Sequence, residues 1–338
     1  MPARPAQNIL EEDRMTFAKI AKLAASCTVA ALMGSAALAQ EVTLKLGHLA
    51  NEENIWHKAA VKFAEEVETL TEGRVAVEVY PNESLGKEID LINGMQLGTA
   101  DMTITGESLQ NWAPKAALLA LPYAYKSLEH MDEVASGEIG DQIEAEIIEK
   151  ADIRPLTYFA RGPRNLSANR EITTPADLNG FKLRVPNVPL FVAAWQALGA
   201  NPTPMAFSEV FTSLQNGTIE GQENPLALFK SGGFYEVQKV VNRTEHVRSW
   251  IYLAISERSW DRLSEADQAA LMEAAERTQT YERELFLADE EALVADLEGR
   301  GVTFHDVDQA AFAEGAREAV IGAVAEEIRP LAEEIFAQ

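Results

Sequence analysis

Arg184 is the residue in this sequence whose type and position best suit the binding of a small anion. It lies in the segment KLRVP, at the end of a predicted short strand that runs into Pro186. Its guanidinium can therefore project beyond the strand into a cleft. A carboxylate matches the planar guanidinium with two parallel hydrogen bonds. Arg184 is thus a candidate for binding a carboxylate, and a solvated surface arginine is the alternative that its residue type leaves open.

Patterns typical of common enzymes are missing from the sequence. There is no G-x-S-x-G elbow, no phosphate-binding G-x-x-x-x-G-K-[ST] loop, no G-x-G-x-x-G turn and no H-E-x-x-H pair. The five histidines are scattered without metal-ligand spacing. We therefore expect no catalytic residues, no cofactor and no metal ion. An enzyme remains an alternative, because catalytic groups that meet only in the folded chain leave no such pattern.

The elements that position these residues begin with a regular alternation of strands and helices. Period-2 and period-3.6 patterns predict three strands separated by two helices, namely Val42 to Gly47, Ile55 to Leu70, Arg74 to Tyr80, Ile89 to Leu97 and Asp101 to Thr105. This alternation predicts a parallel, doubly wound sheet, with ligands bound beyond the carboxyl ends of its strands.

The rest of the chain predicts a second α/β unit followed by long helices. Prolines and glycines separate short elements between Pro155 and Pro225. A long, highly charged helix is expected from about Ser264 to Arg300, followed by a strand from Val302 to His305 and a final helix from Asp308 to Phe336. No linker-like segment is present, so we expect crossing strands to join the two units.

The N-terminus has the pattern of a secretory signal. Lys19 and Lys22 precede an uncharged run of 17 residues that ends in small residues at Ala39. The run is shorter than the roughly 20 residues that span a membrane, so we expect cleavage near Ala39/Gln40 and a periplasmic location rather than a membrane anchor. The acidic residues before Met15 indicate that Met15 is the true start. The only cysteine, Cys27, lies inside the segment predicted to be removed.

The predicted mature chain is strongly acidic. The full chain of 338 residues has 29 basic and 53 acidic residues, and cleavage near Gln40 removes four basic and three acidic ones, which leaves a net charge of −25. Such a charge repels nucleic acid and favours a soluble monomer. A site for an anion must therefore be a local positive region in a negative protein.

Several segments resemble one family of transport proteins. The segments that show the resemblance are RGPRNLSANREI, PADLNGFKLRVPNVPLF, ALGANPTPMAFSEVFTSLQNGTIEGQENPLALF and FYEVQKVV. The segment LKLGHLANEENIWHKAA extends it to the start of the predicted mature chain. They resemble the solute-binding proteins of tripartite ATP-independent periplasmic (TRAP) transporters, the DctP family. The resemblance implies a two-lobed periplasmic binding protein fold, in which each lobe is a twisted sheet flanked by helices and one long helix braces both lobes.

Combined with this fold, the sequence gives approximate lobe boundaries. We expect a signal peptide at residues 1–39. The first lobe is expected to contain residues 40–161 and about 250–289, and the second lobe residues 162–249 and about 290–338. The ligand cleft is expected between the two lobes.

The resemblance also implies roles for residues of the second lobe. Arg184 matches the arginine that makes the main salt bridge to the ligand carboxylate, and Arg164 matches a second arginine that faces the ligand. Two arginines fit either one carboxylate held from two sides or two anionic groups. Asn224 matches an asparagine that contacts ligand oxygens. Glu223 is expected to orient Arg184, and the arginines Arg161 and Arg170, which flank Arg164, are expected to be solvated. A metal ion held through Gln222 and Glu223, as in some 2-oxo-acid binders of the family, is an alternative.

Five further residues are candidates for ligand contact by the same resemblance. Phe207 and Asn187 are expected on the side of the second lobe. Glu107 matches a glutamate that accepts hydrogen bonds from the ligand, and Glu88 and His48 are expected on loops that face the cleft.

These inferences predict a binding subunit that delivers a carboxylate to the small and large TRAP membrane subunits. A hydroxylated sugar acid, such as a uronate or an aldonate, is the preferred ligand class because Glu107 suits ligand hydroxyls. The alternatives are a C4-dicarboxylate, a 2-oxo or 2-hydroxy acid, a subunit of a signalling receptor, and a periplasmic enzyme on the same scaffold.

Overall fold

The structure, a computed structural model, describes residues 42–338. The predicted signal sequence, its cleavage site, Met15 and Cys27 lie outside the described residues. No helix within residues 42–338 is both long enough and apolar enough to cross a membrane.

The first sheet has five strands in the order β2-β1-β3-β10-β4. Its bounds are β1 Val42–Gly47, β2 Val75–Tyr80, β3 Met102–Thr105, β4 Ile153–Ala160 and β10 Trp250–Ser256. Strands β2, β1 and β3 are parallel, as the alternating pattern predicts. Strand β10 runs antiparallel to both β3 and β4, so the sheet is mixed. The expectation of a wholly parallel sheet was wrong because β10 enters this sheet from the second one.

The second sheet has six strands in the order β11-β9-β5-β8-β6-β7 and is also mixed. Its bounds are β5 Arg164–Ala168, β6 Lys182–Val185, β7 Asn201–Pro204, β8 Gly221–Pro225, β9 Val240–Val247 and β11 Thr303–Asp306. Strand β5 is antiparallel to β8 and β9, whereas β6 is parallel to β7 and β8. We call the parts built on the first and second sheets the first and second lobes.

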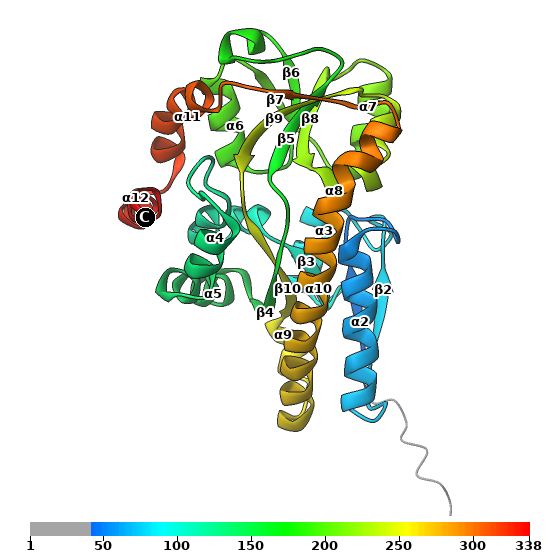
Figure 1. The fold of residues 1–338 in the computed structure, drawn as a ribbon. Helices are drawn as coiled ribbons and strands as arrows, with labels where there is room; N and C mark the ends of the chain where they lie inside the picture. The colour runs from blue at the N-terminus through cyan, green and yellow to red at the C-terminus, as the bar shows by residue number, and fades with distance from the viewer. Residues whose placement is uncertain (1–41) are drawn as a thin grey trace, which may run out of the picture. The chain divides into compact units, whose positions relative to one another are not determined.

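Three segments of the chain connect the two lobes (Figure 1). Residues 161–163 lead from β4 to β5, and residues 248–249 lead from β9 back to β10. The third connection is helix α10, Glu265–Gly299, which packs on α2 and β4 of the first lobe and on α8 of the second. Its bounds agree with the predicted long helix, and Ser264 caps its first turn by accepting a hydrogen bond from the backbone N–H of Asp267.

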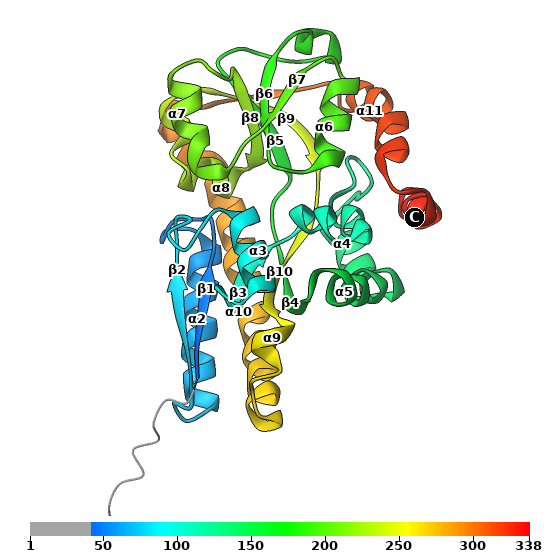
Figure 2. The same cartoon turned by 180° about the vertical axis from the view of Figure 1, so that it is seen from behind.

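Helices cover the faces of both sheets (Figure 2). Around the first sheet these helices are α2 Ile55–Leu70, α3 Glu88–Leu97, α4 Leu128–Ala135, α5 Glu138–Ala151 and α9 Glu257–Trp260, with the 3-10 helices η1 Glu107–Asn111 and η2 Pro114–Ala120. In the rest of the chain they are α6 Pro189–Ala197, α7 Val210–Gln215, α8 Leu226–Ser231, α11 Gln309–Ala323 and α12 Arg329–Ala337, with η3 Pro175–Leu178, η4 Phe207–Glu209, η5 Phe234–Glu236 and η6 Glu326–Ile328.

The spacing of apolar residues explains how these helices pack. Helix α2 buries one face at positions 55, 56, 59, 60, 63 and 67, which is the period of an amphipathic helix. That face packs on β2, and the buried side chains Leu44 and Leu46 of β1 belong to the same core. The second lobe buries Phe191 and Trp195 of α6 in the same way, and α11 packs against α6.

The C-terminal segment differs from the single helix expected between Asp308 and Phe336. Helix α11 ends at Ala323, the backbone is extended at Val324, and the chain continues through η6 into α12. Pro330 excludes one uninterrupted helix through this segment, because proline in a helix interior has no N–H to donate and clashes with the preceding turn. The end of α11 lies seven residues before Pro330, and nothing in the structure explains that position. The new start places Pro330 in the first turn of α12, where its missing N–H is not needed.

A buried carboxyl in α10 makes the stability of this fold sensitive to pH. The side chain of Glu282 is completely buried, and neither of its oxygens has a hydrogen-bond partner of good geometry in the described part of the chain. Burial raises the pKa of Glu282 to about 8, although the nearby charge of Arg283 lowers it in part and that of Asp132 raises it. The group is therefore neutral in the folded protein at neutral pH.

We predict that Glu282→Gln becomes more stable relative to the wild type as the pH rises. The folded pKa lies above the ordinary value of 4.5, so Glu282 contributes fully to stability below pH 4.5 and destabilises the fold progressively up to about pH 8. The difference in unfolding free energy should grow by on the order of 3–5 kcal/mol between pH 5 and pH 9. Urea unfolding at several pH values measures it. The exposed Glu284→Gln on the same helix is the control, and parallel pH profiles for Glu282→Gln and wild type would contradict the prediction.

Candidate functional site

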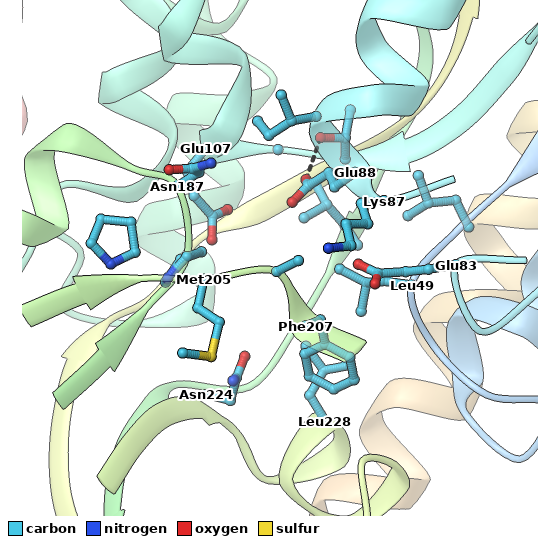
Figure 3. A pocket seen from close by; sticks show the side chains of 18 of the residues that line it. Leu49, Glu83, Lys87, Glu88, Glu107, Asn187, Met205, Phe207, Asn224 and Leu228 are labelled. Carbon is cyan, nitrogen blue, oxygen red and sulfur yellow. Dashed lines mark hydrogen bonds between the residues drawn. The ribbon is translucent and has the colours of Figure 1, made fainter. Parts of the chain in front are cut away.

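A cavity of about 300 Å³ lies between the two lobes. Its walls come from segments just beyond strand ends: the β2–α3 and β3–η1 connections of the first lobe, and the segments after β6 and β7 of the second lobe (Figure 3). This is where α/β sheets place ligands, because strand ends leave side chains and backbone groups free to point outward. The charged and amide residues in the lining are Glu83, Lys87, Glu88, Asp90, Glu107, Arg161, Arg164, Arg184, Asn187, Glu209 and Asn224.

Arg184, on β6, is the guanidinium in this cavity without a carboxylate partner among the described residues. Its side chain is buried, and its Nε and Nη2 donate to the backbone oxygen of Met205 at 3.0 and 2.7 Å. Burial lowers the pKa of Arg184 to about 10, and the charge of Glu223 acts in the opposite direction. Arg184 is therefore still charged at neutral pH, and an anion in the cavity is the group that would compensate it.

Arg164, on β5, is already compensated by the protein. Its Nε and Nη2 donate to the two carboxylate oxygens of Glu223 at 2.5 and 2.7 Å, and the Glu223 backbone oxygen accepts a further bond at 2.7 Å. We expected Glu223 to orient Arg184, and this was wrong, because Glu223 pairs with Arg164 instead. Arg164 is on β5 and Glu223 on β8, and the antiparallel register places Arg164 opposite Pro225, so the side chains of Arg164 and Glu223 are diagonal neighbours on one face of the sheet.

His246 completes a buried network on the far side of Glu223. Its Nε2 lies 2.8 Å from a Glu223 oxygen, and its Nδ1 lies 2.9 Å from the Thr244 hydroxyl. Burial alone would raise the pKa of Glu223, but the charge and hydrogen bonds of Arg164 outweigh it and bring the pKa to about 2. Burial lowers the pKa of His246 despite Glu223. The network therefore contains a buried ion pair and a neutral imidazole at neutral pH.

Glu107 links two arginines at the base of the cavity. It pairs with Arg161 and lies 3.5 Å from Nη1 of Arg164. The prediction that Arg161 is solvated was wrong: its side chain is buried, and its Nε donates to the Ser249 hydroxyl at 2.8 Å. Arg170 is exposed, as expected. Arg161 is buried because it lies on the connection between the lobes, which sequence periodicity does not reveal.

Glu88, the first residue of α3, lines the cavity rather than lying on a loop. Its two oxygens accept hydrogen bonds from the hydroxyls of Thr105 and Ser108 at 2.6 and 3.0 Å. Burial raises the pKa of Glu88, and the charge of Glu107 adds to this effect. Figure 3 shows the Glu88 carboxyl at the cavity with its bond to a neighbouring side chain.

The remaining predicted residues are mostly in the lining as well. Asn224 donates to the Gln222 side-chain oxygen at 2.5 Å, and the backbone oxygen of Asn187 accepts a bond from Asn111 of the first lobe at 2.9 Å. The ring centroid of Phe207 lies 5.3 Å from that of Phe234, and Phe207 also lines the cavity. The structure thus brings Arg184, Arg164, Asn224, Phe207, Glu107, Asn187 and Glu88 to one cavity. Their contact with a ligand stays a prediction.

His48 is not among the cavity-lining residues. It is buried, and its Nε2 lies 3.2 Å from Nδ1 of His57 on α2. Burial, together with His57, lowers its pKa to about 3. His48 directly follows β1, so its place along the strand suggested the cleft; its side chain instead packs against helix α2.

Four charged lining residues were missed by the sequence reasoning, namely Glu83, Lys87, Asp90 and Glu209. The first three follow β2, within a few residues of Glu88, and Glu209 follows β7. The available signal was their position beyond the carboxyl end of a parallel strand. Within residues 42–338, no group of three or more His, Cys, Asp or Glu side chains is placed to hold a metal ion. Gln222 and Glu223, considered as metal ligands, lie behind the cavity wall.

Residues 46–327 match the family described as bacterial extracellular solute-binding protein, family 7, or DctP. The chain belongs to this family. A solute-binding protein of Roseobacter denitrificans is 70% identical over 325 residues, which cover 95% of this chain and 99% of that protein. The 2,3-diketo-L-gulonate-binding periplasmic protein of Escherichia coli is 32% identical over 275 residues, which cover 80% of this chain and 84% of that protein.

Solved structures of TRAP periplasmic solute-binding proteins agree with the fold. A TRAP periplasmic solute-binding protein of Roseobacter denitrificans with bound L-galactonate is 70% identical and matches with a TM-score of 0.87, covering 88% of this chain and 99% of that one. Another protein of that organism, with bound β-D-glucuronate, is 30% identical and matches with a TM-score of 0.83, covering 88% and 99%. The predicted fold class, two lobes with flanked sheets and a long helix, is confirmed.

We predict that Glu223→Gln destabilises the protein by about 3–5 kcal/mol, because it leaves the buried Arg164 with only the more distant Glu107, which also pairs with Arg161. The pKa of Glu223 lies below the ordinary value of 4.5, so its stabilisation is present above pH 4.5 and is lost as the pH falls toward 2. The deficit of the variant should therefore be full at pH 7 and shrink in acid. Urea unfolding measures it, with the exposed Glu236→Gln as control. Equal stability of the two variants at pH 7 would contradict this role.

Proposed function

We propose that this DctP-family protein captures a sugar acid with a single carboxylate outside the cytoplasmic membrane and delivers it unchanged to TRAP membrane subunits. The observation that carries the proposal is the distribution of charge in the cavity. Arg164 and Arg161 have internal carboxylate partners, whereas Arg184 has none in the described chain. One uncompensated guanidinium suits one carboxylate.

The remainder of the lining supports a ligand that carries hydroxyl groups. Glu88 and Glu107, with Asn187 and Asn224, supply acceptors and amide donors around the cavity. The aromatic ring of Phe207 and the side chain of Leu228 offer apolar surface to the carbon chain. Polar groups that converge on one cavity beside a few apolar side chains are typical of a site that fixes the orientation of its ligand.

The relatives support the same ligand class. The ligands named for three of them are L-galactonate, β-D-glucuronate and 2,3-diketo-L-gulonate, each a six-carbon sugar acid with one carboxylate. Since the protein with bound L-galactonate is 70% identical, an aldonate is the ligand class that we favour for this chain. Export by the predicted signal peptide and docking on membrane subunits are part of the same proposal. Recovery of an unchanged ligand distinguishes it from an enzyme.

We predict that Arg184→Ala weakens the binding of L-galactonate by about 2–5 kcal/mol, roughly 30- to 5,000-fold, because the carboxylate loses its buried partner. Arg184→Lys should also bind weakly, since an ammonium cannot form two parallel hydrogen bonds to a carboxylate. Isothermal titration calorimetry measures both variants. The exposed Arg170→Ala is the matched control, and wild-type affinity in Arg184→Ala would refute the assigned role.

We further predict that galactarate, which has a second carboxylate in place of the terminal alcohol, binds at least about tenfold more weakly than L-galactonate. The other three basic residues of the lining are already paired with carboxylates of the protein, so a second ligand carboxylate has no unpaired cation to meet and lies near acidic side chains. A thermal-shift series with aldonates, uronates, aldarates and C4-dicarboxylates tests this, because a tighter ligand raises the melting temperature more. A larger shift with dicarboxylates would instead favour the C4-dicarboxylate alternative.

A further inference from the structure

The rim of the cavity contains a contact between the lobes that the proposed site does not use. Lys87 lies just before α3 of the first lobe, and Glu209 ends η4 of the second lobe. The Lys87 ammonium lies 2.9 Å from a Glu209 carboxylate oxygen, although the two residues are 122 positions apart in the sequence. Both side chains are half exposed, and both residues line the cavity.

A second bond reinforces this contact on the same side of the cavity. The backbone N–H of Ser208 donates to an oxygen of Glu83 at 3.2 Å, again from the second lobe to the first. Figure 3 shows the side chains of Lys87 and Glu83 with their charged ends directed toward one another at one side of the cavity. The other oxygen of Glu83 is buried without a partner in the described chain. We call Lys87, Glu209, Glu83 and Ser208 the rim contact.

The carboxylate of Glu209 is held in place before it meets Lys87. Its second oxygen accepts a hydrogen bond from the backbone N–H of Ala206 at 3.2 Å, within the same short helical turn. Less side-chain freedom is then lost when the ion pair forms, which is the usual cost of an exposed pair. Lys87 has the larger effect in lowering the pKa of Glu209, and the positive charge of Arg184 also helps to lower it. Pairing with Lys87 therefore gives this carboxylate a partner other than the arginine assigned to the ligand.

We propose that the rim contact holds the two lobes together over a bound ligand and so sets the rate at which the ligand is released. The proposal rests on the proposed function, since it takes the cavity as the ligand site. Its bonds join residues of different lobes, so separation of the lobes at this rim must break them. The rim contact thus acts on the lifetime of the complex rather than on recognition of the carboxylate.

The test compares the release rate of L-galactonate from the full protein and four variants. Stopped-flow displacement, followed by the tryptophan fluorescence to which Trp56 in the cavity wall contributes, gives the rate. Lys87→Gln and Glu209→Gln should each release the ligand about two- to fivefold faster, as expected for an exposed ion pair. Lys87→Glu should be faster still, and combining it with Glu209→Lys should restore most of the wild-type rate.

The matched control is Lys150→Gln on α5, which removes an equally exposed lysine whose ion pair with Glu146 lies within one helix. Its release rate should equal that of the wild type. The proposal is overturned if the charge swap fails to restore the rate, because Lys87 would then act by touching the ligand directly. It is also overturned if Lys150→Gln accelerates release to the same extent.

A ligand-free measurement separates failure of the rim contact from failure of the proposed function. Spin labels at Lys58→Cys and Asn216→Cys, exposed positions on the two lobes, report the distance between them in a Cys27→Ser background. Lys87→Glu should shift this distance distribution, and the swap should return it. If the wild type binds no sugar acid, the proposed function fails. The distance between the two spin labels still shows whether the rim contact holds the lobes together. Identical distributions in wild type and Lys87→Glu overturn it.

Discussion

The charge of Arg184, held inside the molecule without a carboxylate of its own, is the constraint on which the site depends. An ion removed from water is costly unless an opposite charge and hydrogen bonds replace its hydration. Here the backbone oxygen of Met205 supplies two hydrogen bonds but no full charge. Under the proposed function, a ligand carboxylate supplies this missing negative charge. The site would therefore favour an anion over a neutral sugar of similar shape.

The other two arginines in the cavity show the opposite arrangement. Arg164 has Glu223 and Arg161 has Glu107, so both are satisfied before any ligand arrives. Glu223 is in turn held by His246, which lies within the second sheet. These buried pairs contribute little attraction for a further anion, but they fix the shape of the wall against which the ligand must fit.

Local patterns predicted much of this architecture, and long-range pairing explains what they missed. The strands and helices between Val42 and Thr105 follow from periods of 2 and 3.6 residues, and the start of α10 follows from the cap at Ser264. The partner of Glu223 depends on the register between β5 and β8, two strands more than 50 positions apart, which no local pattern contains. Burial of Arg161 and the packing of His48 on α2 depend likewise on contacts made only in the folded chain. The family resemblance placed seven of the predicted residues in the cavity.

Arg184 is part of a hydrogen-bonded strand, whereas Glu83, Lys87 and Glu209 lie on connections outside the sheets. Residues on such connections can change without disturbing a core, while a strand residue is held by its neighbours on both sides. Divergence within the family can therefore retain the anchor for the acid group and alter only the surrounding loops. Substitutions in these loops would then change which sugar acid fits, while the site would still require a carboxylate.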